Sequence, residues 1–363
     1  MRVAFRADAS LQIGSGHVMR CLTLADALRA QGAECHFICR AHAGNLIERV
    51  RGLGYVVHEL PPEPDELTPE ASVAHRSWLG ATQEQDVRAC TPILQVLQPD
   101  WLVVDHYALD VRWETPLRAL CRSLLVVDDL ADRAHDCDLL LDQNLGRRPE
   151  DYAGLLPARC VRLTGPRYAL LRPEFARWRD YSLRRRQRPA LRHLLISMGG
   201  VDQPNATGFL LDALGTCPLS EDCSISVIMG GNAPWLDAVR GQAARMPWPT
   251  QVLVGVDDMA RRMADCDLAI GAAGGTAWER CCLGVPSLLV VLAENQWSGA
   301  RALHHCGAAE LIGDLAAIPA LPASLAHLAT DMALARMSQA ASRITDGQGA
   351  QHVTAALMEA CQA

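Results

Sequence analysis

Alternation between short apolar runs and longer stretches with helical periodicity is the feature that most constrains how this chain can fold. The short runs are rich in Val, Ile and Leu, and a longer segment with helix-like spacing follows most of them. Strands of a parallel sheet covered by helices on both faces have this pattern, because both of their faces are buried. The sequence therefore predicts an α/β fold.

The predicted strands form two groups separated by one charged segment. This segment, WRDYSLRRRQRP at residues 178–189, breaks the rhythm and ends in proline. A chain of 363 residues, 50% of them hydrophobic, is long enough for two cores. We therefore expect two Rossmann-like domains, over residues 1–183 and 190–363, and the last helix could return to the first domain. The expected strands are 3–7, 35–39, 56–60, 101–105, 124–128 and 139–142 in the first domain, and 192–198, 224–229, 251–254, 268–271 and 287–292 in the second.

Charge and hydropathy restrict the partners of the chain and its location. The formal net charge is −7 and the 34 Lys and Arg residues are scattered, which leaves no basic face for nucleic acid. The first residues, MRVAFRADAS, lack the apolar region of a signal peptide, and no apolar run approaches the length of about 18 residues that a membrane span needs. We expect a soluble, cytoplasmic protein without nucleic acid as a partner and without stable membrane association.

The 14 cysteines are better explained as reduced core residues than as disulfides, because neither a CxxC pattern nor an export signal accompanies them. A structural zinc ion needs paired ligands at short spacing, and Cys35 with Cys39, near His36 and His42, is the closest candidate. Since a second pair is missing, we expect no metal site, and we expect no cofactor.

Three glycine-containing loops each follow a predicted strand and precede a predicted helix. They are IGSGHVMR at residues 13–20, SMGGVDQPNAT at 197–207 and GAAGGTAWE at 271–279. Open α/β sheets bind ligands at such places, because helix N-termini offer unpaired N–H groups and positive dipole ends. Gly14 and Gly16 permit close backbone approach in the first loop, and the second and third loops could each receive a diphosphate.

None of these loops is a complete Walker or dinucleotide fingerprint. A nicotinamide dinucleotide would also require an acidic residue at the end of the second strand, whereas the strand ECHFICR ends in Cys39 and Arg40. The sequence therefore disfavours a dehydrogenase.

His17 is the candidate for a catalytic group. A purely structural histidine is the alternative, as for any histidine of a folded protein. We predict that a helix starts near His17, and the positive end of its dipole would disfavour the imidazolium form. A neutral ring at this place is suited to act as a general base.

Glu279 has two interpretations that spacing alone does not separate. Thr276 and Glu279 fit a capping box, in which Thr276 caps the helix and Glu279 reaches back to it. The functional alternative is that the carboxylate accepts hydrogen bonds from a ribose diol beside a diphosphate on the same helix end.

Two further segments have less specific interpretations. The Pro- and acid-rich residues 61–71 are expected to form an exposed excursion before Trp78. The basic run at residues 184–188 is interpreted as a solvated linker, with phosphate binding as the alternative.

Seven segments together resemble the family of UDP-sugar hydrolases of pseudaminic acid biosynthesis, usually called PseG. In chain order these segments are IGSGHVMRC, VVDHY, DDLADR, GPRYALLRPEF, SMGG, GAAGGTAWERCCLGVPSL and ENQ. That family is similar in turn to the MurG-like glycosyltransferases of the GT-B class, in which two Rossmann-like domains face each other across a cleft. The resemblance spans almost the whole chain and implies the same architecture.

The resemblance also implies site residues. His17 looks like the residue that activates water, and Asn295 looks like a companion that orients substrate or water. Glu279 would bind the uridine ribose, which favours this role over the capping box. The roles of Asp105, His106 and Tyr107 stay open, and Trp78 is assigned to packing. The residues implied in binding UDP or its sugar are Gly14, Gly16, Arg20, Asp105, Tyr107, Gly199, Gly200, Gly274, Gly275, Thr276 and Glu279.

The activity implied by the resemblance is hydrolysis of UDP-2,4-diacetamido-2,4,6-trideoxy-β-L-altropyranose to UDP and the free sugar, in a pathway that supplies flagellin glycosylation. Because a diphosphate leaves as a stabilised anion, we expect an inverting attack by water without a metal. A glycosyltransferase of the same fold and a non-catalytic UDP-sugar binding module are the alternatives. The sequence defines neither the stereochemistry of the sugar nor the oligomeric state.

Overall fold

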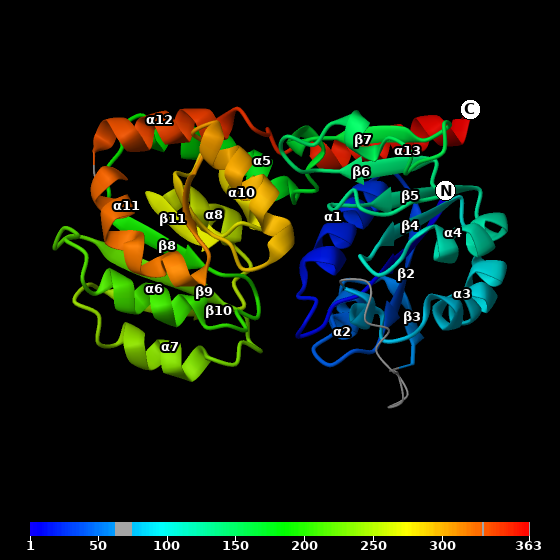
Figure 1. Ribbon diagram of the computed structural model, residues 1–363, viewed down its shortest axis with the longest axis horizontal. Helices are drawn as coiled ribbons and strands as arrows, with labels where there is room; N and C mark the ends of the chain where they lie inside the picture. Colours follow the sequence, from blue (N-terminus) through cyan, green and yellow to red (C-terminus); the bar gives the residue numbers. More distant parts are fainter. Residues whose placement is uncertain (62–74, 329, 363) are drawn as a thin grey trace. The chain divides into compact units, whose positions relative to one another are not determined.

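The computed structural model of the chain describes residues 1–61, 75–328 and 330–362 (Figure 1). The excursion expected at residues 61–71 lies, except for its first residue, outside this described part. The chain divides into two units. Unit 1 comprises Met1–Leu170 and Gly349–Ala363, and unit 2 comprises Leu171–Gln348.

Each unit is built on a parallel sheet with helices on both faces, which confirms the predicted fold class (Figure 1). The strand order is β3-β2-β1-β4-β5-β6-β7 in unit 1 and β10-β9-β8-β11-β12-β13 in unit 2. In both sheets the first strand lies inside the sheet, and the winding reverses beside it. This arrangement creates a switch point between β1 and β4, and another between β8 and β11, where open α/β sheets bind ligands.

The strands of unit 1 are β1 (Arg2–Ala7), β2 (Glu34–Arg40), β3 (Val56–Leu60), β4 (Trp101–Asp105), β5 (Ser123–Val127), β6 (Leu139–Asp142) and β7 (Val161–Thr164). Its helices are α1 (Gly16–Ala30), α2 (Ile47–Gly52), α3 (Gln83–Leu97), α4 (Val111–Leu117) and α13 (Gly349–Gln362), with short 3₁₀ turns η1 (Arg76–Leu79), η2 (Arg118–Leu120), η3 (Pro149–Tyr152) and η4 (Pro166–Tyr168).

The strands of unit 2 are β8 (His193–Ser197), β9 (Ser224–Met229), β10 (Thr250–Val254), β11 (Leu268–Ala272), β12 (Ser287–Val290) and β13 (Glu310–Gly313). Its helices are α5 (Pro173–Arg185), α6 (Ala206–Leu214), α7 (Leu236–Ala243), α8 (Met259–Asp265), α9 (Thr276–Cys282), α10 (Trp297–His305), α11 (Leu321–Leu328) and α12 (Asp331–Ser342), with 3₁₀ turns η5 (Glu294–Gln296) and η6 (Leu315–Ala320).

Both faces of the unit 1 sheet are buried. Val3 and Phe5 of β1 belong to a core cluster that includes residues of α1 and α13, whereas Ala4 belongs to a second cluster that includes residues of α3 and α4. The C-terminal helix α13 is held on this sheet by Trp101, whose indole N–H donates to the Leu357 carbonyl at 3.1 Å. This double burial explains why the strands appear in the sequence as continuous apolar runs.

The charged segment expected between the domains is part of unit 2. Helix α5 packs on α8 and α9, so the division by contacts falls between Leu170 and Leu171 rather than between residues 183 and 190. The interpretation of residues 184–188 as a solvated linker is wrong at Arg186, which is buried and donates to the Met263 and Cys266 carbonyls at 3.0 and 2.8 Å. Its burial and carbonyl partners make it a structural residue.

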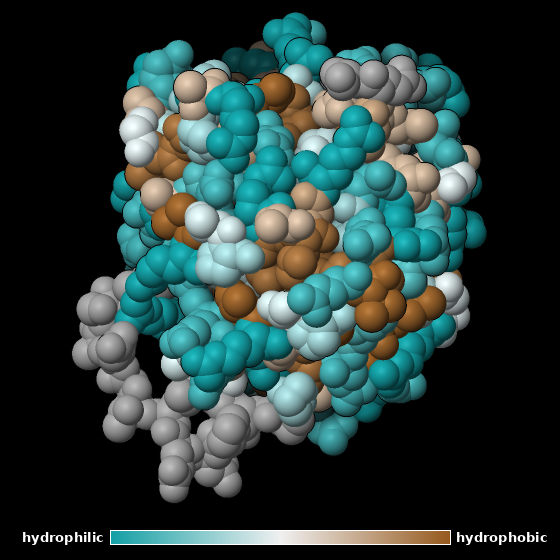
Figure 2. Space-filling view, turned by 90° about the vertical axis from the view of Figure 1, so that its right-hand side faces the viewer, coloured by the Kyte–Doolittle hydropathy of each residue, from teal (hydrophilic) through white to brown (hydrophobic). Residues whose placement is uncertain are grey.

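The cysteine prediction is confirmed, because all 14 cysteines are free thiols and most are buried. No helix in residues 1–61, 75–328 and 330–362 combines the length and the apolar character that crossing a bilayer requires. Apolar side chains nevertheless gather among polar ones on a face of unit 1 (Figure 2).

Candidate functional site

The loop between β1 and α1 places His17 in the first turn of a helix, as predicted. Gly14 has a φ of +79°, which L-residues rarely adopt, and its N–H donates to the Ser10 carbonyl at 2.9 Å. Helix α1 then begins at Gly16, so His17 is its second residue. The His17 side chain is 9% exposed, which leaves it partly accessible at the carboxyl edge of the sheet.

Asp105, the last residue of β4, binds the ring of His17. The distance from His17 Nδ1 to Asp105 Oδ1 is 2.6 Å, and the carboxylate is fully buried. Burial alone would raise the pKa of Asp105, but the charges of Arg20 and His17 outweigh it and hold this pKa well below its usual range. An ionised Asp105 accepts the Nδ1–H of a neutral His17, so Nε2 is left as the proton acceptor.

Arg20 and Tyr107 complete this group, and Asp129 joins them. Arg20 donates from Nε and Nη2 to the two oxygens of Asp105, both at 2.6 Å. Arg20 Nη1 and the Tyr107 hydroxyl both donate to Asp129 Oδ2 at 2.7 Å. Asp129 was not among the site residues predicted from sequence, although it lies in the DDLADR segment that carries part of the resemblance. Its position directly after a buried strand was the available signal.

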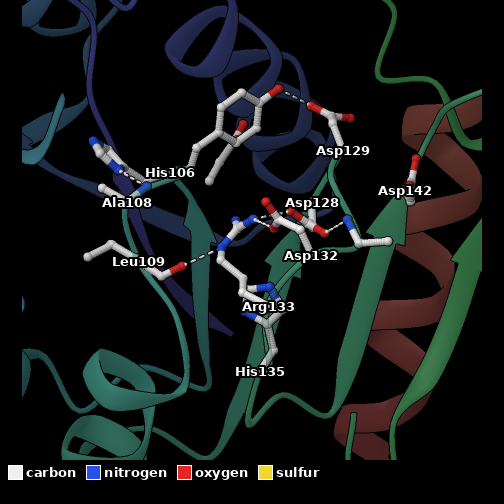
Figure 3. A network of polar contacts seen from close by, with 12 residues as sticks. His106, Ala108, Leu109, Asp128, Asp129, Asp132, Arg133, His135 and Asp142 are labelled. Atoms are coloured by element: carbon white, nitrogen blue, oxygen red, sulfur yellow. Dashed lines mark hydrogen bonds and ion pairs between the residues drawn. The ribbon is translucent and has the colours of Figure 1, made fainter. Parts of the chain in front are cut away.

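His106 turns away from this group and toward Asp8. Its Nδ1 accepts the Ala108 N–H at 3.1 Å, as seen in Figure 3, and its Nε2 lies 3.4 Å from Asp8 Oδ2. Burial lowers the pKa of His106, although the neighbouring Asp8 acts in the opposite direction. A buried, neutral His106 therefore has a structural contact rather than a place beside His17.

Trp78 packs against other aromatic rings, as predicted, and it also lies beside the candidate base. The half-buried indole stacks on Tyr107 with centroids 5.6 Å apart and an interplanar angle of 24°. Its centroid is 6.3 Å from the ring of His17. His75, with a φ of 74°, packs edge-on against the same indole at 4.4 Å. These rings form an aromatic wall next to His17.

In unit 2, the loop from β11 to α9 carries Gly274, Gly275 and Thr276. Gly275 is the N-cap of α9 and no side chain caps this end. Among the N–H groups of the first turn, those of Ala277 and Trp278 bond to the Gly274 and Gly275 carbonyls at 2.9 and 3.1 Å. The N–H groups before them have no intrahelical partner and are available to an anion.

The capping-box interpretation of Glu279 is wrong, because α9 has Gly275 rather than Thr276 as its N-cap, and no side chain caps this end. Burial raises the pKa of Glu279 to about 7, and the charges of Arg172 and Arg280 only partly offset this effect. Because this pKa is near neutral, hydrogen bonds from a donor such as a diol would shift the carboxyl group toward its ionised form.

Arg280 stabilises the same loop through hydrogen bonds. It is 1% exposed, and its Nη2 donates to the Ala272 carbonyl at 2.8 Å while its Nη1 donates to Thr276 Oγ1 at 3.2 Å. Because Thr276 Oγ1 accepts this bond, its own O–H is free to donate to a ligand. A Cβ at Gly271 would lie 2.3 Å from Arg280 Nη1, so glycine is needed there to admit the guanidinium.

The other glycine loop of unit 2, at residues 197–207, provides fewer N–H donors for a ligand. Asp202 accepts the N–H groups of Ala206 and Thr207 at 2.8 and 2.9 Å, and Asn205 accepts that of Gly208 at 3.2 Å. The start of α6 is therefore occupied by its own side chains and has no free N–H among these three for a diphosphate. Gly199, with a φ of +94°, and Gly200 precede this capped turn.

Asn295 lies in η5, next to the loop of Gly274. The neighbouring Gln296 accepts the Leu292 N–H at 2.9 Å, and a Cβ at Gly274 would lie 3.5 Å from Gln296 Nε2. The structure thus brings together Gly14, Gly16, His17, Arg20, Asp105 and Tyr107 in unit 1, and separately Gly274, Gly275, Thr276, Glu279 and Asn295 in unit 2.

Comparison with known proteins supports the fold class. Residues 225–353 match the Glycosyltransferase family 28 C-terminal domain. The crystal structure of MurG from Acinetobacter baumannii superposes with a TM-score of 0.71 at 18% identity, covering 99% of each chain. The chain therefore has the MurG-like, GT-B fold.

Two curated proteins are similar in sequence. The UDP-2,4-diacetamido-2,4,6-trideoxy-beta-L-altropyranose hydrolase of Campylobacter jejuni is 25% identical over 300 residues, which are 83% of this chain and 95% of that enzyme. An uncharacterized protein of Methanocaldococcus jannaschii is 24% identical over 300 residues, but these are only 56% of its length. The similarity to the Campylobacter hydrolase agrees with the resemblance carried by the seven segments.

Proposed function

We propose that the chain hydrolyses UDP-2,4-diacetamido-2,4,6-trideoxy-β-L-altropyranose to UDP and 2,4-diacetamido-2,4,6-trideoxy-L-altrose. The observation that carries this proposal is the pairing of His17 Nδ1 with the buried Asp105 carboxylate at 2.6 Å. It leaves the opposite nitrogen of the ring as a base for water. The similarity to the Campylobacter hydrolase supplies the substrate.

In the proposed reaction, His17 Nε2 takes a proton from water as the water oxygen attacks the anomeric carbon. The bond between this carbon and the β-phosphate oxygen breaks, and UDP leaves with the bonding electrons. Attack opposite the leaving group inverts the anomeric centre. Asn295 is proposed to orient the water or the substrate, and Trp78 with Tyr107 offers rings against which the sugar can pack.

The nucleotide is proposed to bind unit 2. The N–H groups of Gly274, Gly275 and Thr276 and the Thr276 hydroxyl would hold the diphosphate, while the buried Arg280 contributes positive charge. Glu279 would accept hydrogen bonds from the ribose diol. Gly199 and Gly200 are proposed as minor contacts. Because donors and charge of the protein stabilise the leaving diphosphate, the proposed reaction needs no metal.

The test is an incubation of the purified protein with this UDP-sugar in the presence of a chelator, with the anomeric signals followed by NMR and UDP measured. We expect free sugar and UDP in equal amounts, with an inverted first-formed anomer. The apolar surface of unit 1 in Figure 2 justifies a parallel incubation with a lipid acceptor. Turnover only with the acceptor would replace hydrolysis by glycosyl transfer, and binding of UDP without turnover would indicate a binding module.

A further inference from the structure

We propose that Asp129 is a positioning residue of the His17 site, which holds Arg20 and Tyr107 so that the Asp105 carboxylate remains available to His17. This inference rests on the proposed function for its catalytic meaning, but its geometry does not. Asp129 follows β5 and lies beside Asp128 at the carboxyl edge of the sheet (Figure 3). Nothing in the resemblance gave it a role.

Both oxygens of Asp129 are engaged. Oδ2 accepts from Arg20 Nη1 and from the Tyr107 hydroxyl, both at 2.7 Å, and Oδ1 accepts from Asn144 Nδ2 at 3.2 Å. The side chain is 12% exposed, so these bonds are made largely out of water. Asp129 is thus fixed by three donors from three different segments, which makes it a rigid anchor.

Arg20 is held between two carboxylates. Its Nε and Nη2 are occupied by Asp105, and its Nη1 by Asp129. The same Nη2 lies 3.4 Å from His17 Nδ1. A guanidinium at this distance opposes a positive charge on the ring, and Asp129 offsets part of that opposition.

The charge balance shows what Asp129 contributes to proton transfer. With a neutral His17, the one cation Arg20 and the two anions Asp105 and Asp129 leave a net charge of −1, and uptake of a proton by His17 brings it to zero. Without the charge of Asp129, the same uptake would take the group from zero to +1 in a buried place. The second change is less favourable.

Tyr107 gives Asp129 a second connection to the ring. Burial raises the pKa of Tyr107 well above its usual value, so its hydroxyl stays a donor to Asp129. The Tyr107 ring meets His17 edge-on, with centroids 4.6 Å apart and an interplanar angle of 86°. His17, Asp105, Arg20, Asp129 and Tyr107 therefore form a closed circuit of contacts.

Among the other titratable groups near the circuit, Asp142 is itself affected by Asp129, because burial and the charge of Asp129 raise the pKa of Asp142 to about 6. The remaining groups do not replace Asp129. Cys21 Sγ lies 3.6 Å from Asp105 Oδ2, and burial raises the pKa of this thiol, which keeps it neutral. His106 is directed at Asp8. His75 contacts the Tyr107 ring with centroids 5.2 Å apart. Asp128 pairs with Arg133 at 2.9 Å and accepts the Ala131 N–H at 2.8 Å, so it stabilises the loop in which it lies.

The first measurement needs no substrate. Long-range ¹H–¹⁵N NMR records the ring nitrogen signals of His17 as a function of pH. The proteins compared are the wild type, Asp129→Asn and Asp132→Asn, and the His17 signals are assigned by their loss in His17→Gln. Asp132 is a matched control, because it lies in the same loop, pairs with the Arg133 side chain and is 57% exposed. We expect Asp129→Asn to move the titration of the His17 ring to lower pH and Asp132→Asn to leave it in place. An unchanged titration in Asp129→Asn overturns the inference.

The second measurement is the steady-state kinetics of the same variants with Tyr107→Phe added. We expect Asp129→Asn to lower kcat by about ten- to hundredfold, as loss of an outer partner does elsewhere, with KM within about twofold of wild type. The acid limb of its pH–rate profile should move to lower pH. Tyr107→Phe keeps the charge of Asp129, so its acid limb should stay in place.

These outcomes separate the two hypotheses. Turnover by the wild type with equal kcat in Asp129→Asn would overturn the role of Asp129 and leave the proposed function standing. A wild type without turnover, but with the expected NMR shift, would remove the proposed function and leave the positioning role. A general loss of folding would show as a lower Tm, and UDP binding reports on unit 2 independently. An equal fall in kcat for Asp129→Asn and Asp132→Asn would also overturn the inference.

Discussion

The protonation of Glu279 provides a prediction that can be made quantitative. Its pKa is raised to about 7, chiefly by burial, and the proposed ribose contact requires the ionised carboxylate as the acceptor. A group with this pKa is about 90% ionised at pH 8 and about 10% ionised at pH 6. Uridine should therefore bind about tenfold more weakly at pH 6 than at pH 8, because the protonated form must first lose its proton.

Uridine is the appropriate ligand because, unlike UDP, it has no phosphate that titrates in this range. Calorimetry at several pH values with the wild type and Glu279→Gln gives the assay. The Gln variant should bind uridine with an affinity that does not change between these pH values. Affinity of the wild type that is independent of pH, or an equal pH dependence in both proteins, would refute the ribose contact and its linkage.

Linkage also predicts the stability of this variant. A carboxyl whose pKa is higher in the folded than in the unfolded state loses stabilising influence as pH rises through the unfolded and then the folded value. Glu279→Gln should therefore raise Tm relative to wild type at pH 8 and much less at pH 5, as measured by thermal unfolding. A lower Tm at pH 8 would show that the carboxylate has a stabilising partner.

Three further predictions concern other side chains. His17→Gln should lower kcat by about 10²- to 10⁴-fold, the range for a general base, while UDP binding is retained; near wild-type turnover in the folded variant would contradict this role. Thr276→Val should weaken UDP by about tenfold, since a hydrogen bond to a charged phosphate is lost, and should leave uridine binding unchanged in the same titration. Asp86 is fully buried between Arg6 and Arg40, whose attraction outweighs the effect of burial and lowers its pKa to about 2; Asp86→Asn should cost about 3–5 kcal/mol in urea unfolding at pH 7. Because the folded-state pKa is depressed, the contribution of Asp86 is complete above pH of about 4 and declines as pH falls toward 2, and a cost that is equal at pH 3 and pH 7 would contradict this assignment.

The sequence predicted the class of fold and most strands, because buried parallel strands are continuous apolar runs. It missed β7 and β13, the edge strands with the sequences VRLT and ELIG. Val161 of β7 is 55% exposed and all four residues of β13 are half-buried, so neither strand shows the apolar run of a central strand. The assignment of α5 to unit 2 was also unpredictable, because Arg179 and Arg185 donate to the Ser342 and Cys266 carbonyls, which only tertiary structure brings near.

The candidate site was also predictable only in part, because patterns along the chain could be recognised and contacts between distant segments could not. Local signals located His17, since a glycine loop before a helix is a pattern along the chain. The partners of His17 were harder to predict, because Asp105, Arg20 and Asp129 come from separate segments that meet only at the switch point. The position of Trp78 beside His17 was also hidden from the sequence, because its stacking partner Tyr107 lies 29 positions further along the chain.

The proposed function depends on attack by water at the anomeric carbon of a UDP-sugar. Turnover of UDP-2,4-diacetamido-2,4,6-trideoxy-β-L-altropyranose in H₂¹⁸O, with mass spectrometry of the released UDP, tests it most directly. Cleavage between carbon and oxygen predicts UDP without ¹⁸O, since the bridging oxygen leaves with the phosphate. Incorporation of one ¹⁸O into the β-phosphate would show attack at phosphorus and contradict the account, as would the absence of UDP release.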